Sequence, residues 1–338
     1  MRIEKQYLRP IQYKNQLAAL KKNHPKLTID RLAIVACFFN PSGSKRRVKN
    51  FNKFLQGLER SGVHTLVVEL AFGSRKFEIE HEHIIRLRSD SIMWHKERLL
   101  NIGIKQLLSA GYQQIAWLDG DIILTNPNWP WLIAAQLEEN RLCQIFSRAR
   151  IKAADGTSTC KTSAAKRYQE NGHRLKNGKV SGQTGFGWAA RADVLKHVLL
   201  YENAIVGGGD KMIFMASIIQ PHEHDHLKEL TYSHIPCEKC GHRNMSLPYT
   251  TNYLAWAHRW SQAVNRQVGY VEMEIKDMFH GKRSDRKYMS RRNILFRHEY
   301  DPDNDLTVDG NSSFEWADNK QEFSKDMHSY FLSRRENV

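Results

Sequence analysis

The stretch that decides the fold runs from Trp94 to Pro130 and reads WHKERLLNIGIKQLLSAGYQQIAWLDGDIILTNPNWP. Its first half carries apolar residues at helical spacing, among them Leu99 and Leu107, which predicts an amphipathic helix. Gly111 then supplies a stop signal for that helix. The apolar run at 115–118 predicts a short buried strand. The sequence therefore predicts a helix that leads directly into a core strand.

Two carboxylates follow this predicted strand, one residue apart, in Asp119-Gly120-Asp121. The carboxyl ends of strands are where open α/β sheets bind ligands. Two acidic oxygens there can share a hard divalent cation, which can in turn hold a diphosphate. The alternative is a solvated Asp-Gly turn without a ligand. The three residues alone do not separate these two interpretations.

Strands and helices alternate in the sequence before this stretch. We expect strands at 32–39, 64–70 and 84–87, with a helix at 44–60 between the first two. Such alternation is typical of an α/β protein with a parallel-type sheet and right-handed crossovers. We therefore expect a Rossmann-like, nucleotide-binding half. The chain has neither a GxGxxG nor a GK[ST] loop, which removes the main support for a dinucleotide dehydrogenase or a P-loop enzyme.

Composition fits a globular enzyme, with 41% hydrophobic and 10% aromatic residues among 338. No apolar run approaches the length of a membrane span, and the N-terminus lacks the apolar core of a signal peptide. We therefore expect a cytoplasmic protein without a membrane span. The net charge is +15, from 51 basic and 36 acidic residues.

The basic excess is concentrated in two segments. Residues 141–180 hold ten Lys or Arg against two acids, and residues 281–292 hold six against one. An excess of this size favours a polyanionic partner, such as nucleic acid, an anionic glycan or substrate phosphates, over a merely solvated loop. Few aromatic residues are interleaved with these charges, so nucleic acid is not favoured in particular.

Cys237 and Cys240 form one CxxC, with His234 and His242 beside them. These four side chains are a possible structural Zn²⁺ site, although an ordinary loop is the more frequent reading of one CxxC. The five cysteines, an odd number, do not suggest a disulfide framework.

The second half of the chain is less regular. Residues 153–183 are rich in Gly, Ser, Thr, Lys and Asn and predict a long mobile loop. A glycine-rich turn then leads into a strand that contains Gly187 and Trp188, where the backbone can approach a ligand closely. Asp210 follows the run at 207–209 and precedes an apolar helix. It is either a plain helix cap or a general base beside a glycine-lined cleft.

A later segment combines a histidine with a basic cluster. His280 follows a predicted strand at 269–275 and precedes Gly281-Lys282-Arg283, which is expected to open a basic helix that continues to Arg292. A lone histidine is usually structural, but this one is a reasonable metal ligand with phosphate-binding neighbours. A last helix is expected from about residue 318 to 335.

Taken together, these segments resemble metal-dependent glycosyltransferases of the GT-A fold. Asp119-Gly120-Asp121 matches the DxD motif, and the nearest pattern is that of the β-1,4-galactosyltransferases. Their aromatic-x-basic-x-basic-Leu-Leu-Asn segment is matched by WHKERLLN, which contains Trp94, Lys96 and Asn101. The chain is also similar to uncharacterised bacterial and phage glycosyltransferase-like proteins, over most of residues 32–335.

The resemblance implies an organisation of the chain. Residues 1–30 would be a peripheral segment, 31–299 the GT-A domain and 300–338 a C-terminal helical extension. Within the domain, 31–130 would bind the nucleotide-sugar and 140–299 would receive the acceptor.

The resemblance also implies site residues. Mn²⁺ or Mg²⁺ would be held by Asp119, Asp121 and His280, and Asp210 would be the catalytic base. Acceptor and donor would meet beside Gly187, Trp188, Gly208 and Gly209. The nucleotide-sugar, expected to be a UDP-sugar, would contact Asn40, Pro41, Glu69, Trp94, Lys96, Asn101, Gly120, Lys282 and Arg283.

Two departures from the family pattern bear on the acceptor. Lys211 follows Asp210 where that family has adjacent acids, and Ala204-Ile205-Val206 replaces its aromatic platform. Metal and nucleotide binding therefore transfer better from the family than the choice of acceptor or the identity of the base. The resemblance implies an inverting hexosyl transfer to a hydroxyl, and the basic charge favours an anionic acceptor, which is an acidic or phosphorylated glycan or modified DNA. Retaining chemistry, an inactive GT-A-like protein that binds polyanions or nucleic acid, and a nucleotidyltransferase are the alternatives.

Overall fold

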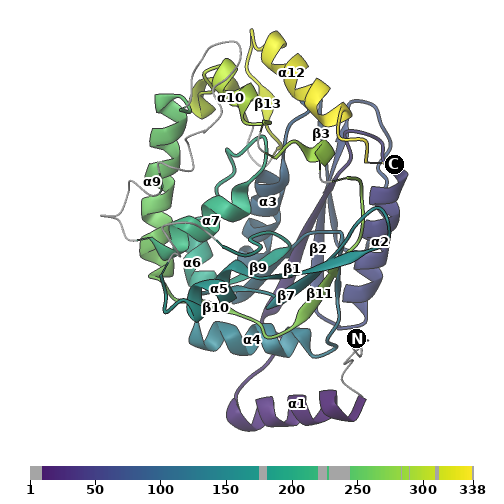
Figure 1. Cartoon of the computed structure of the whole chain (residues 1–338), viewed down its shortest axis with the longest axis vertical. Coiled ribbons are helices and arrows are strands. Elements are labelled where there is room, and N and C mark those ends of the chain that lie inside the picture. Colours follow the sequence, from purple (N-terminus) through teal and green to yellow (C-terminus); the bar gives the residue numbers. More distant parts are fainter. Residues whose placement is uncertain are drawn as a thin grey trace.

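The N-terminal half of the computed structural model alternates strands and helices in the predicted order (Figure 1). Its elements are β1 (Leu32–Phe39), α2 (Lys45–Glu59), β2 (His64–Phe72), β3 (Ile84–Ser89), α3 (Lys96–Ser109) and β4 (Gln114–Leu118). The structure describes residues 10–174, 181–219, 227, 244–282, 284–288, 290–308 and 312–336.

A seven-stranded sheet forms the centre of the molecule, in the order β10-β6-β9-β4-β1-β2-β3. The three strands not yet introduced are β6 (Leu142–Gln144), β9 (Gly187–Arg191) and β10 (Val268–Tyr270). Six strands run parallel, and β9 is antiparallel to both β4 and β6. The order 3-2-1-4 of the first four strands is that of doubly wound sheets, whose ligands bind at the carboxyl ends of the strands. The predicted α/β class with a mostly parallel sheet is confirmed.

Strand β1 is apolar along its whole length because both of its faces are covered. Ile34 and Phe38 pack with α2 and with α4 (Trp129–Glu139) on one face, whereas Ala33 and Val35 pack with α3 on the other. Alternating side chains of a strand point to opposite faces, so one continuous apolar run serves two cores. Figure 1 shows α2 and α3 on either side of β1 and β2.

A second sheet begins where β4 ends. It has the order β5-β11-β7-β8, with β5 (Ile122–Leu124), β11 (Glu274–Asp277), β7 (Arg148–Lys152) and β8 (Ser158–Thr162). The prediction of an irregular loop at 153–183 is therefore wrong for much of that segment. Strand β8 lies within it, and so does α5 (Ala164–Glu170), whose first turn is capped when Ser163 accepts a hydrogen bond from the Lys166 N–H.

Helices cover the α3 side of the central sheet beyond α3 itself. These are α6 (Ala192–His197), α7 (Gly209–Ile218) and α9 (Leu247–Val264), followed by α10 (Asn293–Arg297), α11 (Pro302–Asp305) and α12 (Gln321–Leu332). Between α11 and α12 lies a short strand pair, β12 (Leu306–Thr307) and β13 (Glu315–Trp316). Helix α12 confirms the expected C-terminal helix. Within the described residues, no helix is both long and apolar enough to cross a membrane.

Helix α1 (Pro10–Asn23) lies beside α4 (Figure 1). Asn128, at the start of α4, donates hydrogen bonds to Tyr13 and Gln16.

The predicted basic helix after Gly281 is wrong in the described part of that segment, which has only a 3₁₀ turn (Ser284–Arg286) before α10. Lys287 has φ 46°, which a right-handed helix does not accommodate.

The close packing of α3 on the sheet depends on Gly103. A Cβ at this position would lie 2.5 Å from Val35 Cγ2 and 3.1 Å from Val68 Cγ2. We expect Gly103→Ala to lower the free energy of unfolding by about 1–3 kcal/mol, because the core of β1 and β2 would have to shift. Urea denaturation measures this loss.

Gly57 in α2 is the matched control, because a Cβ there meets no atom within 4 Å. Gly57→Ala should raise the free energy of unfolding by about 0.5–1 kcal/mol, the usual helix preference for alanine. Equal effects of the two substitutions would contradict close packing at Gly103.

Candidate active site

A cleft of about 830 Å³ opens where β1, β4 and β11 end. Its wall contains Asp119, Gly120 and Asp121, together with His280 and Asp210. The predicted metal ligands and the predicted base, which are up to 161 residues apart in the sequence, therefore line one cavity. Of the predicted nucleotide and cleft residues, Trp94, Lys96, Lys282 and Gly208 line it as well.

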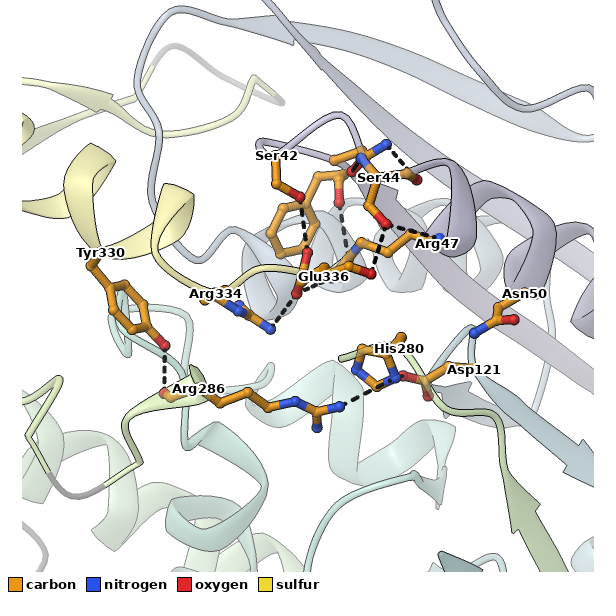
Figure 2. Close-up of polar contacts among 12 residues, drawn as sticks. Ser42, Ser44, Arg47, Asn50, Asp121, His280, Arg286, Tyr330, Arg334 and Glu336 are labelled. Carbon is orange, nitrogen blue, oxygen red and sulfur yellow. Dashed lines mark hydrogen bonds and ion pairs between the residues drawn. The ribbon is translucent and has the colours of Figure 1, made fainter. Parts of the chain in front are cut away.

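Asp121, Asp277 and His280 form the cluster most suited to a metal. One ligand atom from each of them lies within 4.8 Å of the other two. The Asp121 Oδ2 and His280 Nδ1 atoms are 3.1 Å apart. Figure 2 shows these two side chains next to each other. Asp121 Oδ1 is buried without a hydrogen-bond partner in the described part of the chain. An orphaned carboxylate oxygen beside an imidazole and a second carboxylate fits a divalent cation.

The register of the second sheet explains this cluster. Asp277 pairs with Ile122, the residue next to Asp121, in the antiparallel ladder of β5 and β11. The Met278 N–H donates to the Asp121 carbonyl at 2.7 Å, which fixes the turn that leads to His280. Asn50 of α2 also donates to the carbonyls of Met278 and Phe279. Pairing of strands 150 residues apart thus brings the three ligands together.

Burial lowers the pKa of His280, and Arg286 and Arg47 lower it further, although Asp121 acts in the opposite direction. The neutral imidazole is the form that binds a metal.

Asp119 faces away from this cluster and toward Lys96. Lys96 Nζ lies 2.6 Å from Asp119 Oδ1 and 3.0 Å from Asp210 Oδ2, so one buried ammonium joins two carboxylates. Asp119 Oδ2 also accepts a hydrogen bond from the Phe186 N–H. The described cluster thus contains Asp277 and not Asp119, so Asp277 is an additional candidate ligand and the metal role of Asp119 stays a prediction.

The two carboxylates of this ion-paired group differ in their acidity. Burial opposes the charge of Asp119, but Lys96 and the Phe186 N–H outweigh it and lower the pKa of Asp119. Burial raises the pKa of Asp210, and the charge of Asp119 adds to this, while Lys96 acts in the opposite direction. A carboxylate with a raised pKa is a better proton acceptor, which is the property that a general base requires.

Glu97 is a buried acid behind this group that the sequence did not reveal. It is 2% exposed, and its carboxyl packs so closely on α7 that a Cβ at Gly209 would lie 2.2 Å from Glu97 Oε1. Burial raises the pKa of Glu97 to about 8, so it is protonated at neutral pH. The absence of a side chain at Gly209 therefore makes room for Glu97 and does not open the cleft, which Gly209 does not line.

Glycines at three other positions let the backbone approach the site. Gly120 lies under α2, where a Cβ would be 2.1 Å from the ring of Phe51. Gly208 caps α7 with φ 104°, a conformation that favours glycine. Gly185, which the sequence left unassigned, lies beside the carboxylates, because a Cβ there would be 3.6 Å from Asp210 Oδ2.

Asn40, Pro41 and Glu69 do not line the cleft, contrary to expectation. Asn40 is buried and donates to the Ser44 carbonyl and to the Glu78 carboxylate. The Pro41 carbonyl accepts from Arg75. Glu69 accepts from the N–H groups of Glu78 and Ile79. Segment 75–79 therefore uses the strand-end polar groups that were expected to contact a nucleotide.

Asn101, Gly187 and Trp188 also lie outside the cleft lining. Asn101 joins α3 to the segment after α6 by donating to the Leu200 carbonyl and accepting from the Leu200 N–H. Gly187 and Trp188 are core residues of β9. Arg283, Cys237 and Cys240 lie outside the described residues.

The pH dependence of stability should report the protonation of Glu97. Its folded pKa of about 8 exceeds the unfolded value of 4.5, so unfolding releases a proton between these pH values and stability falls as pH rises. Glu97→Gln keeps a neutral side chain. We expect the stability of this variant relative to wild type to increase from pH 5 to pH 8, by on the order of 3 kcal/mol. Urea denaturation at both pH values measures it, and a difference independent of pH would contradict a protonated Glu97.

Comparisons with known proteins give likenesses of fold alone. No family model and no curated protein matches the chain. Among solved structures, it is similar to the catalytic domain of Drosophila β1,4-galactosyltransferase 7, with 13% identity, a TM-score of 0.30, and coverage of 54% of this chain and 59% of that one. It is also similar to a putative nucleotide-diphospho-sugar transferase from Desulfovibrio desulfuricans G20, with 10% identity, a TM-score of 0.30, and coverage of 80% of this chain and 95% of that one. A third similar structure is a putative glucose-1-phosphate thymidylyltransferase from Bacillus anthracis, with 8% identity, a TM-score of 0.32, and coverage of 83% of this chain and 97% of that one.

Proposed function

We propose that this protein is a metal-dependent glycosyltransferase of the GT-A type that moves a sugar from a nucleotide-sugar to a hydroxyl acceptor. The observation that carries the proposal is the pairing of two groups in one cleft. The cluster of Asp121, Asp277 and His280 suits a metal, and Asp210 is a carboxylate with a raised pKa on the same wall. A leaving diphosphate and an incoming hydroxyl require these two kinds of group.

The donor would lie along the metal cluster, with a UDP-sugar as the first candidate from the sequence resemblance. Mn²⁺ or Mg²⁺ held by Asp121, Asp277 and His280 would supply Lewis acidity to the leaving diphosphate. Lys282, two residues after His280, also lines the cleft and adds positive charge to it. Trp94 also lines the cleft.

The chain's own part in the reaction is a proton transfer. The acceptor oxygen forms a bond to the anomeric carbon while the bond from that carbon to the diphosphate oxygen breaks and its electron pair leaves with the diphosphate. Asp210 takes the hydroxyl proton, and Lys96 remains beside it to stabilise the carboxylate before the transfer. Attack from the face opposite the leaving group inverts the anomeric configuration.

The acceptor is proposed to carry negative charge. Arg291 and Arg292 line the cleft beside the Gly207-Gly208 turn, where a Cβ at Gly207 would lie 3.4 Å from Arg291 Nη1. A Cβ at Gly208 would lie 3.6 Å from Arg291 Nη2 and 3.8 Å from Arg292 Nη2, so the two guanidiniums are close together. Burial lowers the pKa of Arg292, as does the charge of Arg291. A phosphate or carboxylate on a glycan would offset their charges. DNA with modified bases would present the same chemistry.

Donor binding should depend on the metal cluster. In a screen of UDP-, GDP-, CMP- and dTDP-sugars with Mn²⁺, we expect one nucleotide class to stabilise the protein by about 2.7 kcal/mol at 100 times its Kd, and EDTA to remove the effect. Asp121→Ala and Asp277→Ala should also remove it. Thermal denaturation measures the stabilisation.

Asp285 supplies the control for this experiment, because it is close in sequence but does not line the cleft. Asp285→Asn should keep the full donor effect. Stabilisation that survives Asp121→Ala would reject the metal cluster as the donor site.

Transfer should require Asp210, while donor binding should not. We expect Asp210→Asn to lower kcat by about 10²–10⁴-fold, because the amide cannot accept the proton, with the donor Kd within about twofold of wild type. Chromatography of the products measures turnover. Equal turnover would reject Asp210 as the base, and release of pyrophosphate in place of a nucleoside diphosphate would indicate a nucleotidyltransferase.

A further inference from the structure

The segment after α12 returns to the cleft and is fastened to the turn between β1 and α2. Ser44 Oγ donates to the Glu336 main-chain oxygen at 3.2 Å, and Ser42 Oγ donates to Glu336 Oε2 at 3.1 Å. The backbone of 334–336 also packs on Gly281, where a Cβ would lie 3.2 Å from Glu336 Cα. We call residues 333–336 the C-terminal strap. It reaches the residue next to His280.

Glu336 holds two arginines in place (Figure 2). Its Oε1 atom lies 2.7 Å from Arg334 Nη2 and 3.2 Å from Arg47 Nη1, and Glu336 is 3% exposed. Burial opposes the charge of Glu336, but Arg47 and Arg334 outweigh it and lower the pKa of this carboxyl to about 2. An ionised carboxylate at this place fixes the two guanidiniums beside each other.

A third arginine is positioned by the same C-terminal region. Tyr330 of α12 donates from its hydroxyl to the Arg286 carbonyl at 3.1 Å, and Arg286 Nη2 lies 3.3 Å from His280 Nδ1. Arg47, Arg286 and Arg334 all line the cleft. Arg334 also lies over the ring of Trp94, with its guanidinium carbon 5.4 Å from the ring centroid.

The positive charge of these three arginines exceeds the negative charge that the strap supplies. Glu336 carries one negative charge against their three positive ones, which leaves a difference of +2 (3 − 1). The Nε atoms of Arg47, Arg286 and Arg334 are buried, and none has a hydrogen-bond partner in the part of the chain that the structure describes. A buried donor without a partner costs free energy, so these three side chains are held at the cleft at some cost to stability.

We propose that the C-terminal strap completes a diphosphate-binding wall of the cleft, with Arg334 as a binding residue and Glu336 as the residue that positions Arg334 and Arg47. This inference rests on the proposed function and names the part of the site that receives the donor's diphosphate. Guanidiniums match phosphate oxygens in charge and geometry, and this wall adjoins the Asp121, Asp277 and His280 cluster.

The test uses inorganic pyrophosphate with Mg²⁺ as the probe, because its binding does not depend on a base or a sugar. We expect calorimetry on the full chain to detect binding to the wild type. Arg334→Met should raise the Kd at least tenfold, and Glu336→Gln should raise it severalfold. Uridine, which has no phosphate, should bind all variants alike if it binds the wild type.

Arg297→Met is the matched control. Arg297 pairs with Asp326 of α12 at 2.6 Å, and it lies outside the cleft lining, so its loss should leave the Kd within twofold of wild type. An unchanged Kd in both Arg334→Met and Glu336→Gln would overturn the proposal, as would a wild type that does not bind pyrophosphate. Pyrophosphate binding that needs Arg334, in a protein that binds no nucleotide-sugar, would support the wall and reject the glycosyltransferase.

Discussion

The buried ion pairs of Lys96 with Asp119 and Asp210 are the interaction on which the cleft depends. Lys96 begins α3, Asp119 follows β4, and Asp210 lies in the first turn of α7. A buried ammonium is stable only with partners that offset its loss of water, and here the partners come from two separate elements. The helix packed on β1 and β2 is thereby tied to α7. Movement of either carboxylate would leave the buried ammonium with a single partner.

The two carboxylates of the Asp-Gly-Asp motif belong to different sheets. The Asp119 N–H donates to the Phe186 carbonyl, which continues the ladder of β4 and β9. Asp121 precedes β5, and its carbonyl accepts from Met278 in the second sheet. The motif therefore spans the junction between the sheets, with Gly120 between them under Phe51. This division directs Asp119 toward Lys96 and Asp121 toward His280, so two similar side chains have different surroundings.

The elements of the first half could be predicted because their signals are local. Strand β1 is an uninterrupted apolar run, and α2 has its apolar residues at helical spacing. Asp277 could not be found in this way, because only the register of β5 and β11 brings it to Asp121. The structural role of Asn40 and Glu69 was equally hidden, since segment 75–79, which uses them, has no pattern of its own. Glu97 carries no signal of burial in the sequence, because charged helix residues are mostly exposed, yet α3 is buried on nearly every side.

The strongly basic composition has a structural explanation that the sequence alone did not supply. The sequence located a charge excess at 281–292, and Arg286, Arg291 and Arg292 of that segment do line the cleft. Arg47 and Arg334, which lie far from that segment in the sequence, line it too. Acidic side chains that suit a cation are thus surrounded by guanidiniums that suit an anion. The proposed ligand, a divalent cation with a diphosphate, would place an opposite charge beside each of these two sets.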